Sequence, residues 1–282
     1  MSRNASVLHS PRTTSVSAGK TRALSPSPPP PLPHQDALAF SYKHLHRLPA
    51  SILSTLWVEQ IVAQIIVPGQ MHVLNLSCGT GYFTRLLRMW GAASVLAVDE
   101  SSAMITAAKD ETYDTAISYH VTNARDVDRR YAGSPFDFAI GCWLLNDADN
   151  GEEMAKMFGQ VANNLSEEGV FVTLAHTCVE DPAQWLKETE AKRPRGKGHI
   201  WVEQEEEFRD GVKVRVKAGT EPLEIGWDAY MLKKSTHEYA ARKGGFRGRL
   251  KWIDCEVPAE SGGRFGGYED VPCASIMILE KA

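Results

Sequence analysis

The sequence predicts an α/β fold with a doubly wound, mainly parallel sheet that ends in an antiparallel pair of strands. Three observations lead to this prediction. Strand-like apolar runs alternate five times with helix-like patterns at the spacing of β-α-β units, which favours parallel strands. Two glycines one residue apart follow the first apolar run, as in turns that bind anions between a strand and a helix. Two further apolar runs come late in the chain, after a helix-like stretch, and are expected to be the last two strands.

The regular part of the pattern begins with a helix. Residues 51–67 carry apolar side chains at helical spacing, and we expect this helix to end before Pro68. The elements expected next are strand 71–76, helix 82–90 closed by Gly91, strand 94–100, helix 101–110, strand 117–123, strand 136–145, helix 152–165 and strand 169–175 after a turn at Glu168-Gly169. Right-handed crossovers would place the carboxyl ends of these strands on one edge of the sheet, where a ligand is expected.

The pattern is looser after the fifth strand. Residues 199–218 resemble two strands joined around Asp210-Gly211, and Asp-Gly is a hairpin signal. Ser235 and Glu238 have the spacing of a capping box, which predicts that a helix begins there. The late strands are expected at 251–257 and 273–281.

Composition limits the class of protein. The 282 residues carry a net charge of −4, so we expect no nucleic-acid partner, and no apolar run approaches the roughly 18 residues that cross a membrane. The five cysteines are odd in number and form no C-x-x-C pair. We therefore expect reduced thiols, a cytoplasmic location and no metal site.

Residues 1–38 differ from the rest of the chain. Seven of the fifteen prolines lie between Pro11 and Pro33, and no acidic residue precedes Asp36. Such a segment cannot bury enough apolar surface to fold, so we expect a disordered Pro/Ser-rich tail. An organellar transit peptide and a polyproline ligand around residues 28–33 are the alternatives. The folded domain is then expected to span 39–282.

The glycine turn predicts a site for one nucleoside. It lies in "HVLNLSCGTGYFTRLLRMWG", residues 72–91, whereas a dinucleotide fingerprint needs G-x-G-x-x-G. Thr84 stands where the third glycine should be. Asp99 ends the next expected strand, 18 residues after Gly81, at about the place of an acid that binds ribose hydroxyls. The pattern therefore favours one ribose and disfavours a pyrophosphate.

At these positions the sequence resembles the class I S-adenosylmethionine-dependent methyltransferases, which have a Rossmann-like fold. "VLNLSCGTG" (73–81) resembles their first motif, and "VLAVDESSAMITAAK" (95–109) resembles the second. "VTNARDV" (121–127) resembles the motif that contacts adenine, and "FDFAIGCWLLNDA" (136–148) resembles the fourth. The resemblance covers roughly residues 42–177.

A closer resemblance is to the small-molecule methyltransferases of the toxoflavin-synthase type. It rests on "YKHLHRLPAS", "YFTRLLRMWGAASVLAVDESSAMI", "WLLNDA" and the late "EPLEIGWDAYMLKKSTHEYAARKGGF". This resemblance implies transfer of a methyl group from S-adenosylmethionine to N, O or S of a small metabolite, in secondary metabolism. The small-molecule acceptor would lie against an insertion at 176–232. The oligomeric state does not follow from the sequence.

The resemblance also implies which residues bind the cofactor. Asp99 would accept both ribose hydroxyls, and the loop around Gly79 would let the backbone approach the methionine part and the ribose. Asn123 would meet the adenine amino group, and Tyr42 would reach the carboxylate. The implied cofactor-binding set is Tyr42, Asn75, Ser77, Gly79, Thr80, Gly81, Asp99, Met104, Asn123, Ala124 and Cys142.

Three positions depart from the usual motifs. Asn75 stands where the first motif has an acid, so we expect weaker binding of the cationic cofactor, by about 1 kcal/mol for one charge-assisted bond. Asn123 replaces an aspartate that is common in the adenine motif, at a smaller cost. Ser77 stands where glycine or alanine is usual and is expected to crowd the turn slightly.

His176, just past the fifth strand, is the expected general base, and a histidine satisfied by loop backbone is the alternative. Tyr82 and Trp143 are expected either to line the acceptor site or to belong to the core. The same choice applies, in the insertion, to Trp227, Asp228 and Tyr230. Asp147, Asp149 and Asn150 resemble part of a metal cluster, but a solvated acidic loop is the simpler interpretation.

Other functions stay open at this stage. One alternative is a non-catalytic protein that binds S-adenosylmethionine as a scaffold, which the missing acid at Asn75 suggests. Another is a cofactor-binding enzyme that catalyses a cyclisation or rearrangement instead of methylation. An NAD-dependent oxidoreductase is disfavoured by Thr84.

Overall fold

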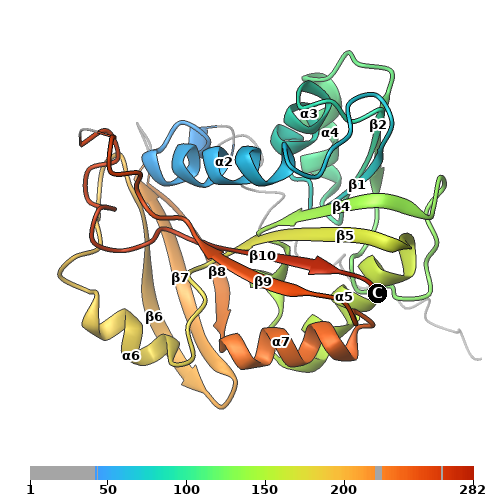
Figure 1. Cartoon of the computed structure of the whole chain (residues 1–282). Coiled ribbons are helices and arrows are strands. Elements are labelled where there is room, and N and C mark those ends of the chain that lie inside the picture. Colours follow the sequence, from blue (N-terminus) through green and yellow to red (C-terminus); the bar gives the residue numbers. More distant parts are fainter. Residues whose placement is uncertain (1–41, 43, 220–223, 262) are drawn as a thin grey trace, which may run out of the picture. The chain divides into compact units, whose positions relative to one another are not determined.

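The computed structural model describes residues 42, 44–219, 224–261 and 263–282. Its central sheet has the order β3-β2-β1-β4-β5-β10-β9 (Figure 1). The first five strands are parallel, and β10 is antiparallel to both β5 and β9. The strands are β1 His72–Leu76, β2 Ser94–Asp99, β3 Ile117–Val121, β4 Phe136–Cys142, β5 Leu165–Ala175, β9 Leu250–Asp254 and β10 Ser275–Glu280. The predicted doubly wound sheet with its C-terminal antiparallel pair is confirmed.

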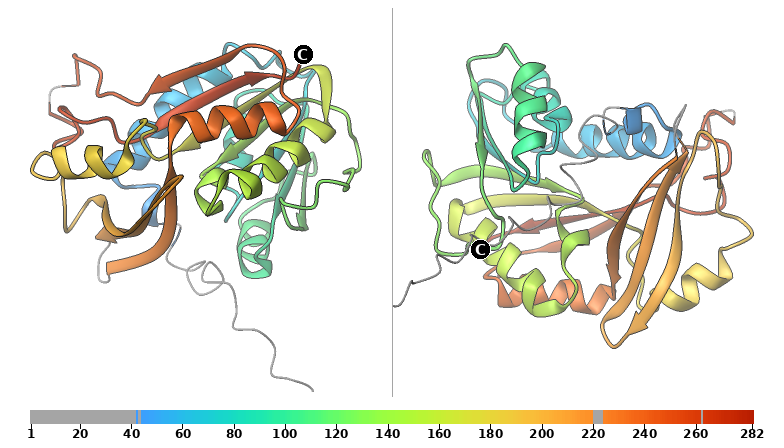
Figure 2. Two further views of the ribbon diagram at one scale, coloured as in Figure 1. Left: turned by 90° about the horizontal axis from the view of Figure 1, so that it is seen from below. Right: turned by 180° about the vertical axis from the view of Figure 1, so that it is seen from behind.

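Helices cover the two faces of this sheet. The structure has α2 Pro49–Val62, α3 Tyr82–Met89, α4 Ser102–Asp110, α5 Gly151–Asn164 and α7 Lys234–Lys243 in these layers. Helices α5 and α7 lie side by side beneath the sheet, and α2 and α3 lie on the opposite side (Figures 1 and 2). The order of the strands reverses between β1 and β4, so the carboxyl ends of these two strands flank a topological switch point.

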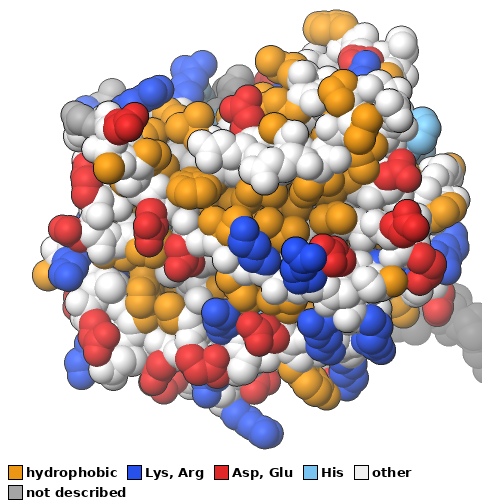
Figure 3. Space-filling model, viewed as in Figure 1, with side chains coloured by type: hydrophobic (Ala, Val, Ile, Leu, Met, Phe, Trp, Pro, Cys, Tyr) orange, Lys and Arg blue, Asp and Glu red, His pale blue; other side chains and the backbone are white. Residues whose placement is uncertain are grey.

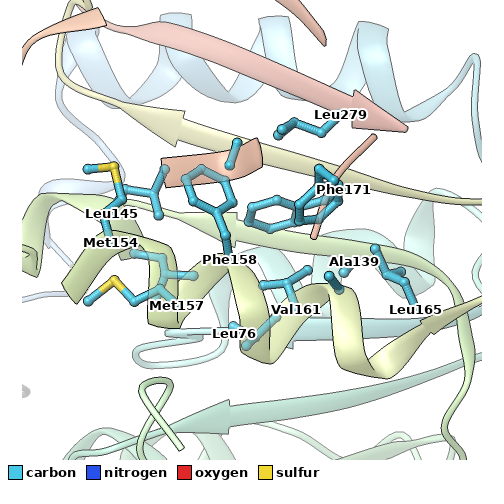
Figure 4. Close-up of a cluster of buried hydrophobic side chains, with 14 of the residues drawn as sticks. Leu76, Ala139, Leu145, Met154, Met157, Phe158, Val161, Leu165, Phe171 and Leu279 are labelled. Atoms are coloured by element: carbon cyan, nitrogen blue, oxygen red, sulfur yellow. The ribbon is translucent and has the colours of Figure 1, made fainter. Parts of the chain in front are cut away.

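Each central strand contributes side chains to both hydrophobic cores. In β1, Leu74 and Leu76 belong to the core between the sheet and α5, and Val73 belongs to the core between the sheet and α2. Phe158 of α5 packs edge-on against Phe171 of β5, with ring centroids 6.1 Å apart (Figure 4). Burial on both faces explains why the strands read as continuous apolar runs in the sequence.

A second, three-stranded antiparallel sheet adjoins the carboxyl ends of β4 and β5. It has the order β6-β7-β8, with β6 Ile200–Phe208, β7 Gly211–Gly219 and β8 Glu224–Leu232, and α6 Pro182–Glu188 packs on it. The hairpin between β6 and β7 was predicted from Asp210-Gly211 and is confirmed. Strand β8 and helix α6 were not predicted, although apolar side chains alternate along β8 at residues 225, 227, 229 and 231.

Some details of the predicted pattern differ from the structure. No helix lies between β3 and β4, where residues 122–135 run as loop and turns, so strands and helices do not alternate at this point. Strand β5 begins at Leu165, four residues before the predicted start at Gly169. The Glu168-Gly169 pair lies within β5 at an irregularity of the β4–β5 pairing, and Gly169 O accepts a hydrogen bond from Lys281 N just past β10. The neighbouring strands thus keep a turn-like sequence extended.

The capping box predicted at α7 is also wrong. The helix begins at Lys234, one residue earlier, and no side chain caps it. The Ser235 hydroxyl donates to the Glu180 carboxylate, and the Glu238 carboxylate accepts from the Trp252 indole at 3.0 Å. Both side chains that would have formed the local cap are therefore bonded to residues of other segments.

The surface of one face is mixed in character. Hydrophobic side chains gather across its middle, while acidic and basic side chains are interspersed below them (Figure 3). Of the helices that the structure describes, none combines the length and apolar character needed to cross a membrane. The expected tail at 1–38, with its transit-peptide and polyproline alternatives, lies outside the described residues.

Candidate active site

A cavity opens at the carboxyl ends of β1, β2, β4 and β5, between the two sheets. Most of the expected cofactor residues line it, as does the expected base, and the set is Tyr42, Asn75, Ser77, Gly79, Thr80, Asp99, Met104, Cys142 and His176. Three expected residues are outside its lining. Gly81 is buried beneath the turn, Asn123 is exposed, and Ala124 packs against the core under α5.

The two glycines of the turn have different structural roles. Gly79 has φ +54°, and a Cβ there would meet no atom within 4 Å, so the backbone leaves open space beside it. Gly81 has φ +79°, and a Cβ there would collide with the Tyr119 hydroxyl and lie 2.9 Å from Arg85. Gly79 thus leaves room for a ligand, whereas Gly81 lets α3 begin close to β3.

Asp99 fixes the glycine turn to the end of β2. Its carboxylate accepts hydrogen bonds from Gly79 N at 2.8 Å and from Ser101 N at 3.0 Å. The side chain is only 7% exposed yet lines the cavity. A carboxylate oxygen can accept more than one hydrogen bond, so the same group can hold the turn and bind hydroxyls of a ligand.

Asn75, which departs from the first methyltransferase motif, is bonded to Thr84, which departs from the dinucleotide fingerprint. The Asn75 side-chain amide donates to the Thr84 hydroxyl at 2.9 Å, and both residues are buried. Thr84 is the residue that replaces the third glycine of a dinucleotide fingerprint. Because the amide nitrogen is used in this bond, the carbonyl oxygen of Asn75 is the atom that can accept a hydrogen bond from a ligand.

Backbone strain concentrates at the same edge. Ser77 has φ +53° and Trp143 has φ +67°, and they are the only non-glycine residues with positive φ in the described chain. Ser77 follows β1 and Trp143 follows β4, the two neighbouring strands at the switch point, and both line the cavity. Strained residues of this kind cluster at ligand-binding sites.

His176 follows β5 and lies against Trp143, with ring centroids 5.6 Å apart. Burial lowers the pKa of His176 to about 4, so the imidazole is neutral near pH 7. Its Nε2 atom is buried and has no hydrogen-bond partner among the described residues. The Asn146 side-chain oxygen accepts from the His176 backbone amide at 3.5 Å. The loop therefore forms a hydrogen bond with the backbone of His176 and leaves Nε2 of its ring without one.

The segment before α2 forms another wall of the cavity. Burial raises the pKa of the Tyr42 hydroxyl, and the negative charges of Asp147 and Asp99 raise it further, so this hydroxyl lies near both carboxylates. The His46 ring stacks on Tyr82 with centroids 3.8 Å apart, and burial lowers the pKa of His46 to about 4. The N-terminal segment thus brings neutral aromatic rings to the site.

The acidic loop after β4 has no metal-binding arrangement. The Asn150 side chain caps α5 by accepting from Glu152 N and Glu153 N, both at 2.9 Å. No group of three or more histidine, cysteine, aspartate or glutamate side chains suited to a metal occurs in the described part of the chain. Asn146 and Asp147 line the cavity, and sequence reasoning did not assign either to the cofactor site. Their position just past the end of β4 was the available signal.

The alternation of β8 separates the three candidates from the insertion. Trp227 lines the cavity together with Ala229 and Met231. Asp228 points to the other face and pairs with Arg215 at 2.6 Å, and Tyr230 packs on Phe208. Further aromatic residues of the lining that the sequence did not single out are Phe83, Trp185, Trp201 and Tyr268.

Residues 73–169 match the family model of a methyltransferase domain. No curated protein matches the chain in sequence. Among solved structures, an S-adenosylmethionine-dependent methyltransferase from Clostridium acetobutylicum aligns with a TM-score of 0.55 at 16% identity, over 86% of this chain and 98% of that one. An amino pentose methyltransferase from Micromonospora echinaspora, involved in calicheamicin biosynthesis and solved with S-adenosylmethionine bound, aligns with a TM-score of 0.53 at 12% identity, over 87% and 97%. At these identities the structural likeness speaks for the fold.

The motif residues at the carboxyl edge of the sheet, the strand order and the family model all indicate the same class of domain. Residues 73–169 therefore match a methyltransferase domain, and the strand order is that of the Rossmann-like fold found in the solved methyltransferases.

Proposed function

We propose that the protein transfers the methyl group of S-adenosylmethionine to N, O or S of a small molecule. The observation that carries this proposal is one continuous cavity. It runs from the Asp99-anchored glycine turn, past Trp143 and His176, to the aromatic side chains of the three-stranded sheet. A nucleoside site and an acceptor site would thus share one enclosed space.

The residues of the turn suit the cofactor. Open space beside Gly79 admits the methionine part and the ribose, and Asp99 offers a carboxylate for the ribose hydroxyls. Met104 is buried on the floor of the cavity, where its flexible thioether would pack on adenine. The Tyr42 hydroxyl, the Asn75 oxygen and the Cys142 carbonyl are the polar atoms proposed for the methionine end. Asn123, Ala124 and Gly81 would act indirectly, through the shape of the loops.

The bound cofactor supplies a methyl group that is activated by a sulfonium. The protein then has to hold the acceptor in line with it and keep water out, which buried aromatic walls do. The acceptor heteroatom forms the new bond to carbon while the carbon–sulfur bond breaks, and the sulfur keeps the electron pair. For an O–H or N–H acceptor, the neutral His176 ring takes the proton that is lost.

The finer assignments are proposals as well. The toxoflavin-synthase-like motifs favour a role in secondary metabolism. The described cysteines are free thiols, which favours a reducing, cytoplasmic location. Residues 176–232 are proposed as the acceptor-side insertion, because they contain α6 and all three strands of the second sheet.

One alternative keeps the cofactor and drops the transfer. Asn75 stands where an acid usually faces the cationic cofactor, so a scaffold or a cyclase that binds S-adenosylmethionine remains the second candidate. Its distinguishing property is cofactor binding without release of S-adenosylhomocysteine.

Calorimetric titration of the purified chain with S-adenosylmethionine and with NAD tests the proposal. We expect heat of binding with the first and none with the second. S-adenosylhomocysteine release is then measured over a panel of phenols, thiols and heterocyclic amines. His176→Gln should lower the rate with a phenol about 100-fold while the cofactor affinity stays unchanged. Absence of S-adenosylmethionine binding would overturn the proposal, and binding without turnover across the panel would favour the second candidate.

A further inference from the structure

We propose that the acceptor is an uncharged, planar aromatic molecule. This inference rests on the proposed function and specifies its substrate class. It concerns the acceptor half of the cavity, which we call the aromatic chamber and define by Trp143, Trp185, Trp201, Trp227, Tyr268 and His176.

The chamber collects its rings from separate elements. Trp143 follows β4, Trp185 belongs to α6, Trp201 to β6 and Trp227 to β8. Tyr268 comes from the loop between β9 and β10. Because these residues are far apart in the sequence, no single amphipathic element accounts for their convergence. Aromatic walls favour flat aromatic ligands through stacked and edge-on contacts, in addition to the burial of apolar area.

An acidic acceptor would find a single cation in the described lining of the cavity. The charged side chains in the described lining of the whole cavity are Asp99, Asp147 and Arg193. The Arg193 guanidinium donates to Val202 O at 2.9 Å, to Leu186 O at 2.8 Å and to the Thr189 hydroxyl at 3.1 Å. These bonds use three of the five guanidinium N–H donors and hold the group 5.7 Å from the centre of the Trp185 ring, so an anionic acceptor would find one cation that already bonds the backbone.

The residues that define the chamber include no carboxylate for a cationic acceptor. Both carboxylates of the lining act on the Tyr42 hydroxyl, and the Tyr42 ring lies 5.8 Å from Trp227 at the margin of the chamber. His46 and His176 are neutral because they are buried. A charged group of either sign would therefore lose its hydration among the aromatic rings and meet an opposite charge only at the margin of the chamber.

Polar contacts remain for a neutral heteroatom. The Trp201 indole donates to Glu203 at 3.1 Å, and the Tyr268 hydroxyl donates to Ile200 O at 3.0 Å. The indoles of Trp143, Trp185 and Trp227 also line the cavity, and Nε2 of His176 has no hydrogen-bond partner within the described residues. Indole N–H groups and one imidazole suit a hydroxyl, a carbonyl or a ring nitrogen of a neutral heterocycle.

Four matched probes test this selectivity. They are 2-naphthol, which is flat and neutral; 2-naphthoate, which is flat and anionic; 2-naphthylmethylamine, which is flat and cationic; and decahydro-2-naphthol, which is neutral but not flat. Each is titrated calorimetrically into the full chain, with and without saturating S-adenosylhomocysteine. We expect 2-naphthol to bind at least about tenfold tighter than the other three. Equal or tighter binding of any of the three would overturn the inference.

Variants locate the binding. Trp227→Leu should weaken 2-naphthol binding by about tenfold, while Trp227→Phe should largely retain it and report a correctly folded chamber. The control is Trp90→Leu, because that indole bonds Glu59 and lies outside the cavity lining. S-adenosylhomocysteine affinity should stay unchanged in all three variants. If Trp90→Leu weakens 2-naphthol binding as much as Trp227→Leu does, the site lies elsewhere and the inference fails.

The two proposals can fail separately. If 2-naphthol binds selectively but S-adenosylmethionine does not bind, the proposed function is wrong and the chamber assignment stands. If S-adenosylmethionine binds and 2-naphthol shows no preference, only the substrate class is wrong.

Discussion

The two sheets of this protein are built differently and contribute differently to one cavity. The seven-stranded sheet is apolar on both faces and presents backbone turns and short polar groups, such as Gly79 and Asp99, at its edge. The three-stranded sheet is amphipathic. Val212, Val214 and Val216 of β7 are buried on its inner face, while the charged residues between them face outward.

This difference predicts different sensitivities to mutation. A site made from backbone turns depends on φ angles and on single hydrogen bonds, so small substitutions there have large effects. A site made from large side chains on an outlying sheet can change its selectivity while the fold is kept. The four predictions that follow test this contrast.

The largest effect is expected at Asp99. Asp99→Ala removes the acceptor for ribose hydroxyls and releases the amides of Gly79 and Ser101, so S-adenosylmethionine affinity should fall about 100-fold or more. Calorimetric titration measures the loss, and Asp99→Asn is the matched control because it keeps one oxygen acceptor. A change of less than threefold in Asp99→Ala would place the ribose site elsewhere; that factor is a rough threshold set by the usual worth of one hydrogen bond.

Substitution of the two glycines of the turn should destabilise the protein to different extents, because Gly81 is closely surrounded and Gly79 is not. Gly81→Ala combines a positive φ with collisions at Tyr119 and Arg85 and should lower the free energy of unfolding by about 3 kcal/mol. Gly79→Ala meets no neighbour and should lower the free energy of unfolding by about 1 kcal/mol through its φ angle alone. It should also weaken cofactor binding. Urea unfolding of both variants checks this order. Equal destabilisation would mean that the turn is not packed as described.

Acidification should destabilise the folded protein. Burial lowers the pKa of His46, His176 and His237 to about 4, whereas an unfolded histidine titrates near 6.5. As the pH falls from 6.5 to about 4, the unfolded chain takes up protons that the folded chain refuses, so stability is lost through this window. The Tm at pH 5 should lie below that at pH 7.5. His237→Gln, which is outside the cavity lining, should reduce this drop without changing cofactor affinity. A Tm that is flat from pH 7.5 to 5 would contradict the burial of these rings.

The smallest effect is expected on the outer face of the three-stranded sheet. Asp228 pairs with Arg215 at 2.6 Å and with Lys213 at 3.0 Å, but these groups are substantially exposed. Asp228→Asn should therefore change the free energy of unfolding by less than about 1 kcal/mol and leave methyl transfer unchanged. Denaturant unfolding and turnover measure both quantities. A clear loss of activity would show that this face also serves the acceptor, against the alternation of β8.

Much of the cofactor edge could be predicted from the sequence. The alternation of strands and helices, the glycine turn and the acid at the end of β2 are local patterns, so nine expected site residues line one cavity. Asn123 and Ala124 follow β3, and a motif position alone does not say where their side chains point. The Asn123 side chain accepts from Arg125 N at 2.7 Å, a local turn that its spacing did not reveal.

The sequence by itself determined the sheet, its turn and the residues proposed for the nucleoside, because each depends on periodicity and short spacing along the chain. The tertiary structure decided the rest. It gave Ser235 and Glu238 partners from other segments in place of a capping box, and it paired Asn75 with Thr84. It also brought four tryptophans from four segments into one chamber. Such contacts join residues far apart in the chain, and no local pattern specifies which partners packing will bring together.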